Sequence, residues 1–200
     1  MTTQTSAQRG RTGFGTAMLA MALLVAGMWL LEGLDQASSN ALDAYGIRPR
    51  TGEGLLGVFV APWLHGGWAH LISNTVPFFV LGVLVLLDGW GQWFRTTLVV
   101  VLVSGAAVWL LAPPGSITLG ASGVVIGWLT YLVVRGFYTG SAGQIVLGLV
   151  IFLLYGGMLW GVLPTDTAVS WQAHLGGALG GFLAARSRRR TTQASVRRRT

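Results

Sequence analysis

Two residues in apolar sequence could act together as a nucleophile and its base. Ser122 lies in the string Gly120-Ala121-Ser122-Gly123, and His174 follows Ala173 in a later apolar segment. A histidine beside a serine can take the hydroxyl proton as general base and return it to a leaving amine as general acid. These residue types therefore predict acyl transfer through a covalent intermediate.

Further donors could stabilise the negative charge that develops in such a reaction. His70 and Asn74 are four residues apart, so they share one face of a helix. A donor aimed at a developing oxyanion is worth about 2.7 to 4 kcal/mol. We expect Ser122 in the first turn of a helix, where its own backbone N–H has no helical partner and lies at the positive end of the helix dipole.

The acidic residues predict a Ser–His dyad rather than a triad. A third member would have to be a buried carboxylate beside His174, but every acid lies at the end of an apolar segment or in a loop. The six are Glu32, Asp35, Asp43, Glu53, Asp88 and Asp166.

Simpler explanations exist for each of these residues. A Gly-x-Ser-Gly string arises readily in glycine-rich membrane sequence, where serine packs between helices, and a buried histidine can be a structural hydrogen-bonder. His65, His70 and His174 could instead hold zinc. Against zinc, His65 and His70 lack the i, i+4 spacing and no His-Glu-x-x-His string occurs. We expect neither metal nor cofactor.

The elements that must position these residues are membrane helices. Hydrophobic residues make up 52% of the chain and charged residues 10%, and a bilayer core needs about 20 residues of helix. The fold class predicted is an all-α polytopic membrane protein with one six-helix bundle. The predicted spans are 14–34, 68–87, 96–112, 120–135, 143–163 and 169–185.

Charge predicts the orientation of this bundle. All thirteen basic residues are arginines; in a six-span arrangement only Arg48 and Arg50 fall on one side, so the positive-inside rule places both termini in the cytoplasm. The domains expected are a tail at 1–13, the bundle at 14–186 and a basic tail at 187–200. The arginines of that last tail suit nucleic acid, but an arm near anionic lipid explains them, so no nucleic-acid partner is expected.

Helical rise brings the polar residues to one layer. Measured from the charged residues at the inner ends of their spans, the heights are roughly 20 Å for Ser122, 18 Å for His174, 21 Å for Asn74 and 27 Å for His70. In a core of about 30 Å, this layer is submerged on the order of 10 Å below the outer surface. The reference residues are Asp88, Arg135 and Arg186.

Small residues predict which helices pack closely. Gly123 and Gly127 are four apart in the fourth span, as are Gly177 and Gly181 in the sixth. Such faces let two helix backbones approach each other. We expect the fourth and sixth spans to be the close pair, which would bring Ser122 and His174 together.

The combination resembles the rhomboid family of intramembrane serine proteases over residues 14–186. The resemblance lies in three motifs in order, namely His65, His70 and Asn74; Gly120, Ala121, Ser122 and Gly123; and Ala173, His174, Gly177 and Gly181. The stretch 46–50 also resembles the first external loop of small bacterial members.

This resemblance implies hydrolysis of a peptide bond in or near the transmembrane helix of another membrane protein. Ser122 would be the nucleophile and His174 the base, with the Ser122 N–H, His70 and Asn74 forming the oxyanion hole and His65 in a supporting role. Gly120, Gly123, Gly177 and Gly181 would support the site. The protein would lie in a bacterial plasma membrane with its site open to the outer side.

The resemblance also predicts a gate over the site, and two alternative functions remain. The loop 164–170 and the outer part of the fifth span would cap the site, and the segment 35–62 is too long for a simple connector and would shield it. Ile126 stands where several bacterial members have an aromatic residue on the catalytic histidine. The rivals are a catalytically silent rhomboid-like protein that binds client helices and a small transporter, although the inner half of the bundle lacks a continuous polar path.

Overall fold

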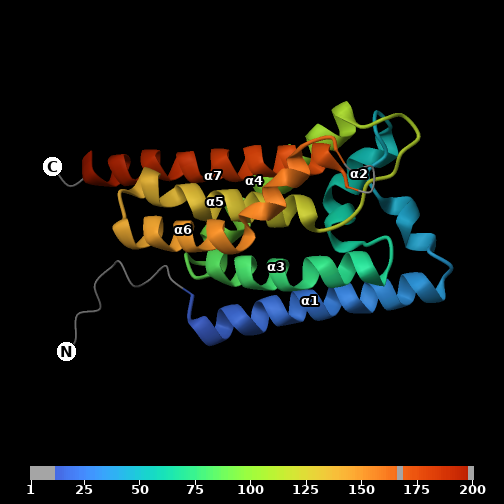
Figure 1. The fold of residues 1–200 in the computed structure, drawn as a ribbon, viewed down its shortest axis with the longest axis horizontal. Coiled ribbons are helices and arrows are strands. Elements are labelled where there is room, and N and C mark those ends of the chain that lie inside the picture. Colours follow the sequence, from blue (N-terminus) through green and yellow to red (C-terminus); the bar gives the residue numbers. More distant parts are fainter. Residues whose placement is uncertain (1–11, 166–168, 198–200) are drawn as a thin grey trace.

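The computed structural model describes residues 12–165 and 169–197, which are nearly all helical (Figure 1). The elements in order are α1 (Phe14–Ala37), η1 (Ala41–Tyr45), α2 (Gly52–Val60), η2 (Ala61–Trp63), α3 (Trp68–Leu86), α4 (Trp90–Leu111), α5 (Ser122–Thr139), α6 (Ala142–Tyr155), η3 (Gly156–Val162) and α7 (Trp171–Arg197). Within the described ranges, the one β contact is an isolated bridge between Ile47 and Thr118. The predicted all-α bundle is confirmed.

Each predicted span corresponds to a helix, with differences at the ends. The third begins at Trp90 rather than 96, because Gly89 turns the chain at φ 105° and the tryptophans after it join the helix. The fifth ends in the 3₁₀ segment η3, and the sixth continues to Arg197, into the segment that sequence assigns to the basic tail.

The segment 35–62 is structured and holds a helix that the hydrophobic pattern did not predict. Thr51 caps α2 by accepting a hydrogen bond from the Gly54 N–H at 3.0 Å, as serine and threonine commonly do at helix starts. Gly57 of α2 lies against the Gly46 carbonyl with no room for a side chain. Because α2 is short and rich in glycine, a helix there could not be predicted from hydrophobic periodicity.

Length and apolarity mark this chain as a multi-pass membrane protein. By these two criteria α1, α3, α4 and the stretch Ala142–Val162 can each cross a membrane. The side chains of α6 that face outward are apolar and open, such as Leu153 at 75% exposure. α5 lies inside the bundle, where it packs against α3, α4, α6 and α7.

α5 and α7 approach through glycines. A Cβ atom on Gly177 would overlap the Gly123 carbonyl oxygen, and one on Gly181 would overlap that of Gly127. The prediction that the fourth and sixth spans form the close pair is confirmed. Backbone contact of this kind is what small residues at helix interfaces permit.

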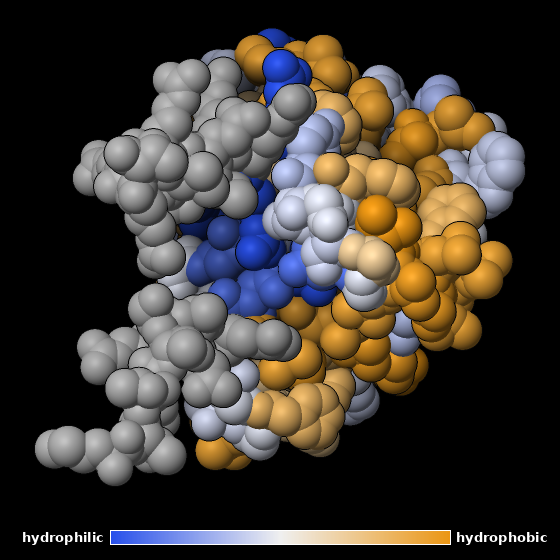
Figure 2. Space-filling view, turned by 90° about the vertical axis from the view of Figure 1, so that its left-hand side faces the viewer, coloured by the Kyte–Doolittle hydropathy of each residue, from blue (hydrophilic) through white to orange (hydrophobic). Residues whose placement is uncertain are grey.

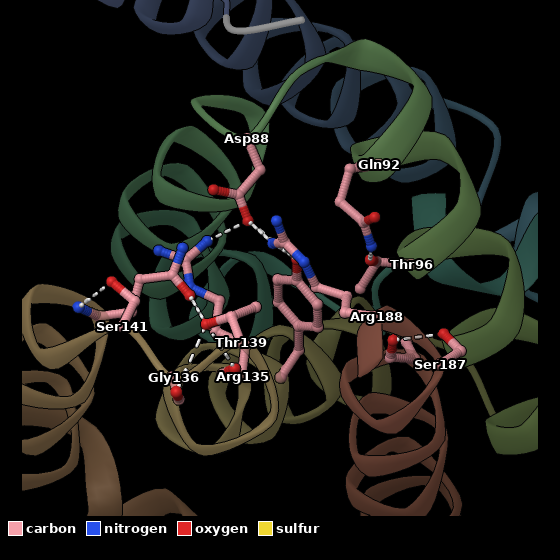
Figure 3. A network of polar contacts seen from close by, with 12 residues as sticks. Asp88, Gln92, Thr96, Arg135, Gly136, Thr139, Ser141, Ser187 and Arg188 are labelled. Carbon is pink, nitrogen blue, oxygen red and sulfur yellow. Dashed lines mark hydrogen bonds and ion pairs between the residues drawn. The ribbon is translucent and has the colours of Figure 1, made fainter. Parts of the chain in front are cut away.

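A charged network around Asp88 joins the helices at one end of the bundle (Figure 3). We call this end the inner end, because the sequence predicts Asp88 at the inner end of its span. Asp88 Oδ2 accepts hydrogen bonds from Arg135 and Arg188 and, at 2.8 Å, from the Tyr131 hydroxyl. The start of α1 and the end of α7 lie at this end (Figure 1), and Figure 2 shows hydrophilic side chains in a hollow there, with apolar side chains to the right of it. The opposite end is the outer end. Asp88 and Arg135, two of the reference residues of the depth argument, are therefore in direct contact.

Candidate active site

Ser122 is the first residue of α5 and half-buried. The loop before it is held by two hydrogen bonds, from the Gly120 N–H to the Ala61 carbonyl at 2.9 Å and from the Ala121 N–H to His65 Nε2 at 3.4 Å. The Ser122 N–H, at the positive end of the helix, has no partner within α5. A hydroxyl and a backbone N–H without a helical partner thus belong to the same residue.

Gly120 is the residue that lets His70 approach this loop. Its φ of 119° is rarely open to residues with a side chain, and a Cβ atom there would lie 2.6 Å from His70 Cε1 and 2.7 Å from Nε2. The His70 ring therefore packs directly on the backbone two residues before Ser122.

His174 lies in the first turn of α7, with 7% of its surface exposed. Its Nδ1 is 3.2 Å from the carbonyl oxygen of Gly161 in η3. A carbonyl only accepts, so Nδ1 carries the proton and Nε2 keeps the lone pair of a base. Nε2 is buried and has no hydrogen-bond partner in the part of the chain that the structure describes.

Ser104 of α4 connects the two halves of the site. Its hydroxyl donates to the Ala173 carbonyl at 2.8 Å, next to His174. Gly123, next to Ser122, packs on the same hydroxyl, and a Cβ atom on it would lie 3.2 Å from that Ala173 carbonyl. The residue after the serine and the residue before the histidine therefore meet at one point.

One cavity of about 780 Å³ is lined by Ser122, His174, His70 and Asn74. Its other polar side chains are Ser73, Ser116, Thr118, Ser170 and Gln172, and the loop before α7 contributes Pro164 and Val169. The four predicted residues, from three helices, thus face one space. The glycines Gly123, Gly177 and Gly181 lie at the α5–α7 contact instead, and His65 lies behind the loop.

The two predicted oxyanion donors differ in how they are held. Asn74 is buried and its Nδ2 donates to the His70 carbonyl at 3.0 Å, which uses one of the two N–H bonds of the amide. The His70 ring is steadied by His65 in an edge contact, with centroids 5.1 Å apart. One amide N–H of Asn74 and the His70 ring are thus available for the cavity.

His65 is a neutral support. Burial, with a smaller contribution from the neighbouring His70, lowers the pKa of His65 to about 4. Its Nε2 can therefore accept the Ala121 N–H at neutral pH. In the described ranges, no three His, Cys, Asp or Glu side chains are arranged to hold a metal ion.

Comparison with known proteins identifies the family. A family model described as the Rhomboid domain matches residues 52–190. This chain belongs to the rhomboid family. The rhomboid is 41% identical over 192 residues to an uncharacterized protein of Mycobacterium tuberculosis, covering 92% of this chain and 79% of that one. An uncharacterized protein of Mycobacterium leprae is 38% identical, covering 88% and 72%. Rhomboid-like protease 5 of Toxoplasma gondii is 34% identical over 157 residues, covering 74% of this rhomboid and 18% of that protein.

Sequence reasoning missed two residues of this rhomboid's site. Ser104 carried a signal, because it is a hydroxyl within an apolar span. Gly161 carried none, since it acts through its backbone carbonyl. Ile126, the position where the resemblance predicts an aromatic residue on the histidine, is fully buried in the core. The contact that holds His174 comes from η3.

The predicted gate of the rhomboid is described in part. The outer part of the fifth span is η3, which packs on α7, so this segment contributes to the site directly. Of the predicted cap 164–170, residues 166–168 lie outside the described residues.

Proposed function

We propose that this rhomboid is a serine endopeptidase that hydrolyses a peptide bond in or near the transmembrane helix of other membrane proteins. The observation that supports it best is the state of His174, whose Nδ1 is held by the Gly161 carbonyl while Nε2 keeps an unengaged lone pair. Ser122 lines the same cavity as this histidine. A base oriented by an acceptor, in the same cavity as a hydroxyl, is an arrangement suited to activating a nucleophile.

In the first half-reaction, Ser122 Oγ attacks the carbonyl carbon of the substrate as His174 Nε2 takes the hydroxyl proton. The tetrahedral oxyanion is stabilised by the Ser122 N–H, the Asn74 amide and the His70 ring. Collapse breaks the carbon–nitrogen bond, and the proton on Nε2 passes to the leaving amine. The product is an acyl ester on Ser122.

In the second half-reaction, water replaces the amine. His174 Nε2 takes a proton from water as its oxygen attacks the ester carbon, and collapse returns this proton to Ser122 Oγ with release of the carboxylate. The hydroxyl and amide groups along the cavity wall can hydrogen-bond such a water within an otherwise apolar bundle. No step requires a metal or cofactor.

The substrate must present an extended segment to this cavity. A peptide carbonyl in a helix is engaged by its own hydrogen bond, and glycine or proline lowers the free energy of unwinding it. We therefore expect substrates with a small residue at the cleavage point and helix-destabilising residues nearby.

The proposal also includes the orientation of the bundle in the membrane. The bundle of residues 14–186 lies in a bacterial plasma membrane with tails 1–13 and 187–200 in the cytoplasm and the cavity towards the outer side. The arginine distribution supports this orientation.

The test is cleavage of a single-span substrate with a small residue near its outer boundary, in liposomes. The wild type is compared with Ser122→Ala and His174→Ala, and with Ser38→Ala, an exposed serine after α1, as matched control. We expect cleavage and fluorophosphonate labelling by wild type and control, loss in both site variants, and no effect of a chelator. Absence of cleavage across several substrates together with absence of labelling would refute the proposal and favour a silent protein that binds client helices.

A further inference from the structure

A second cavity, of about 560 Å³, lies on the side of the bundle where α1 and α4 are separated. α1 packs along α3 (Figure 1), which leaves a groove between α1 and α4 that the α2–η2 segment closes at one end. Its walls include Ala20 and Leu24 of α1, Leu98 and Val101 of α4, and Pro62 and Trp63 of η2. The one hydroxyl among its lining residues, that of Thr97, already accepts a hydrogen bond from Trp128 at 3.1 Å.

The groove extends over about half of the membrane. Its wall on α4 runs from Trp90 to Val101, which is roughly 16 Å of helix axis. Trp90 follows directly on Asp88 and Gly89, so the groove begins at the inner end, at the level where tryptophan side chains gather in membrane proteins. The hydrocarbon core is about 30 Å thick, so the length of the groove corresponds to one leaflet.

The walls on α3 and α5 reach the same depth as the wall on α4. Phe78 on α3 precedes Asp88 by ten residues, and Val124 on α5 precedes Arg135 by eleven, which gives roughly 15 Å and 16 Å above the inner end. Trp63 of η2 packs edge-on against Phe78, with ring centroids 6.5 Å apart. The closed end of the groove is therefore near the middle of the bilayer.

The length of the groove selects its occupant. Pro62 and Trp63 close it near the middle of the bilayer, so a helix that crosses the whole membrane cannot lie along it past this point. An acyl chain from one leaflet ends at that depth. Several wall residues are open to the surroundings, such as Leu23 at 64% and Phe94 at 60% exposure, and at this depth the surroundings are hydrocarbon chains.

We propose that this groove holds one acyl chain of a glycerophospholipid from the leaflet at the inner end. An empty groove would forfeit dispersion contacts along its whole wall, and an extended acyl chain restores them without a polar partner. The glycerol and headgroup then lie at Trp90, at the membrane surface.

The end of the acyl chain would support the segment that holds the loop before Ser122. This end lies under Pro62 and Trp63, next to Ala61, whose carbonyl accepts the Gly120 N–H at 2.9 Å. His65 follows in the same segment. Removing the lipid is therefore expected to loosen this loop, and that consequence for activity rests on the proposed function.

The test measures lipid directly, so it does not depend on activity. Wild-type protein reconstituted in phosphatidylethanolamine and phosphatidylglycerol vesicles is released in mild detergent and examined by native mass spectrometry. Ala20→Trp fills the groove, and Leu149→Trp, on an exposed face of α6, is the matched control. We expect one retained phospholipid in wild type and control and at least tenfold less in Ala20→Trp.

A second measurement does not rely on variants that must fold. Vesicles containing a phospholipid with a diazirine in the middle of its acyl chain are irradiated, and the crosslinked peptides are sequenced. We expect crosslinks on α1 near Leu24 and on α4 near Leu98 in excess over α6. Equal labelling of all outward helix faces, equal lipid retention in the two tryptophan variants, or no retained lipid in wild type would each overturn the proposal.

Discussion

The Gly161→Ala substitution probes what orients His174, the proposed general base. A Cβ atom at this position would lie 3.0 Å from His174 Cε1 and closer still to Nδ1, the atom that donates to the Gly161 carbonyl. The backbone of Gly161 does not have a positive φ, so alanine is compatible with the local conformation. The added methyl group therefore acts on the ring, which must turn or shift away from its acceptor.

The size of the effect follows from the bond at risk. In the proposed mechanism the imidazole gains a positive charge when it takes the Ser122 proton, and a hydrogen bond to a charged group contributes about 1.5 to 3 kcal/mol. Because 1.36 kcal/mol is a tenfold change in rate, Gly161→Ala is expected to lower kcat roughly 10- to 150-fold. The loss should appear in kcat more than in KM, because the charge develops only during the reaction.

The assay compares Gly161→Ala with Gly157→Ala, a second glycine of η3 around which a Cβ atom would meet nothing within 4 Å. Both are assayed for cleavage of the model substrate in liposomes and for the rate of fluorophosphonate labelling of Ser122, and thermal unfolding establishes that both are folded. We expect the control to match wild type. If Gly161→Ala cleaves and labels within twofold of Gly157→Ala, the Gly161 carbonyl does not orient His174 and the reasoning is wrong.

Three further predictions concern packing, pH and the inner end. Gly177→Val should lower the free energy of unfolding by about 1 to 3 kcal/mol or more through overpacking against the backbone of α5. Gly143→Val, with open space around it, should change that free energy by less than about 1 kcal/mol, because valine is a slightly better helix former than glycine; denaturation in detergent compares the two variants. The pKa of His65 is about 4 in the folded state against 6.5 in the unfolded state, so the unfolded state binds a proton more readily and stability should fall as pH drops from 6.5 towards 4. His65→Gln should flatten this part of the curve of melting temperature against pH. An unchanged slope would contradict the assignment of this effect to His65. Asp88→Asn should destabilise by up to about 3 to 5 kcal/mol because two guanidinium groups lose their shared carboxylate, and an unfolding curve like that of wild type would show the network to be dispensable.

Much of the fold could be predicted because membrane helices are long and apolar. The spans corresponding to α1, α3, α4 and α6 follow from length and hydropathy. Those corresponding to α5 and α7 follow from their glycine spacing and from Arg135 and Arg186, although both helices continue past these arginines. The exceptions have physical causes. α2 is short and rich in glycine, and η3 departs from the α-helix within an unbroken apolar run, so neither changes the hydrophobic pattern.

The candidate site was predictable where chemistry depends on side-chain type. Ser122, His174, His70 and Asn74 are costly polar groups in apolar sequence, and the rise of a helix is sufficient to place them at one depth. Contacts that depend on backbone atoms leave no such trace. The Gly161 carbonyl and the Ala61 carbonyl could be found only once the chain was folded.

The arrangement around His174 also gives a reason why the proposed mechanism needs no acidic third member. An ionised aspartate at membrane depth costs about 2.5 to 3.5 kcal/mol on insertion scales, so an acidic third member would be expensive to keep charged. A carbonyl near the end of a helix has no following N–H to bind and is already dipolar. Gly161 lies one residue before the end of η3, which leaves its carbonyl available to accept the Nδ1 proton. The break from α-helix to 3₁₀-helix within an apolar span thus provides an acceptor for the base without burying a charge, and the absence of a side chain at Gly161 lets the ring reach it.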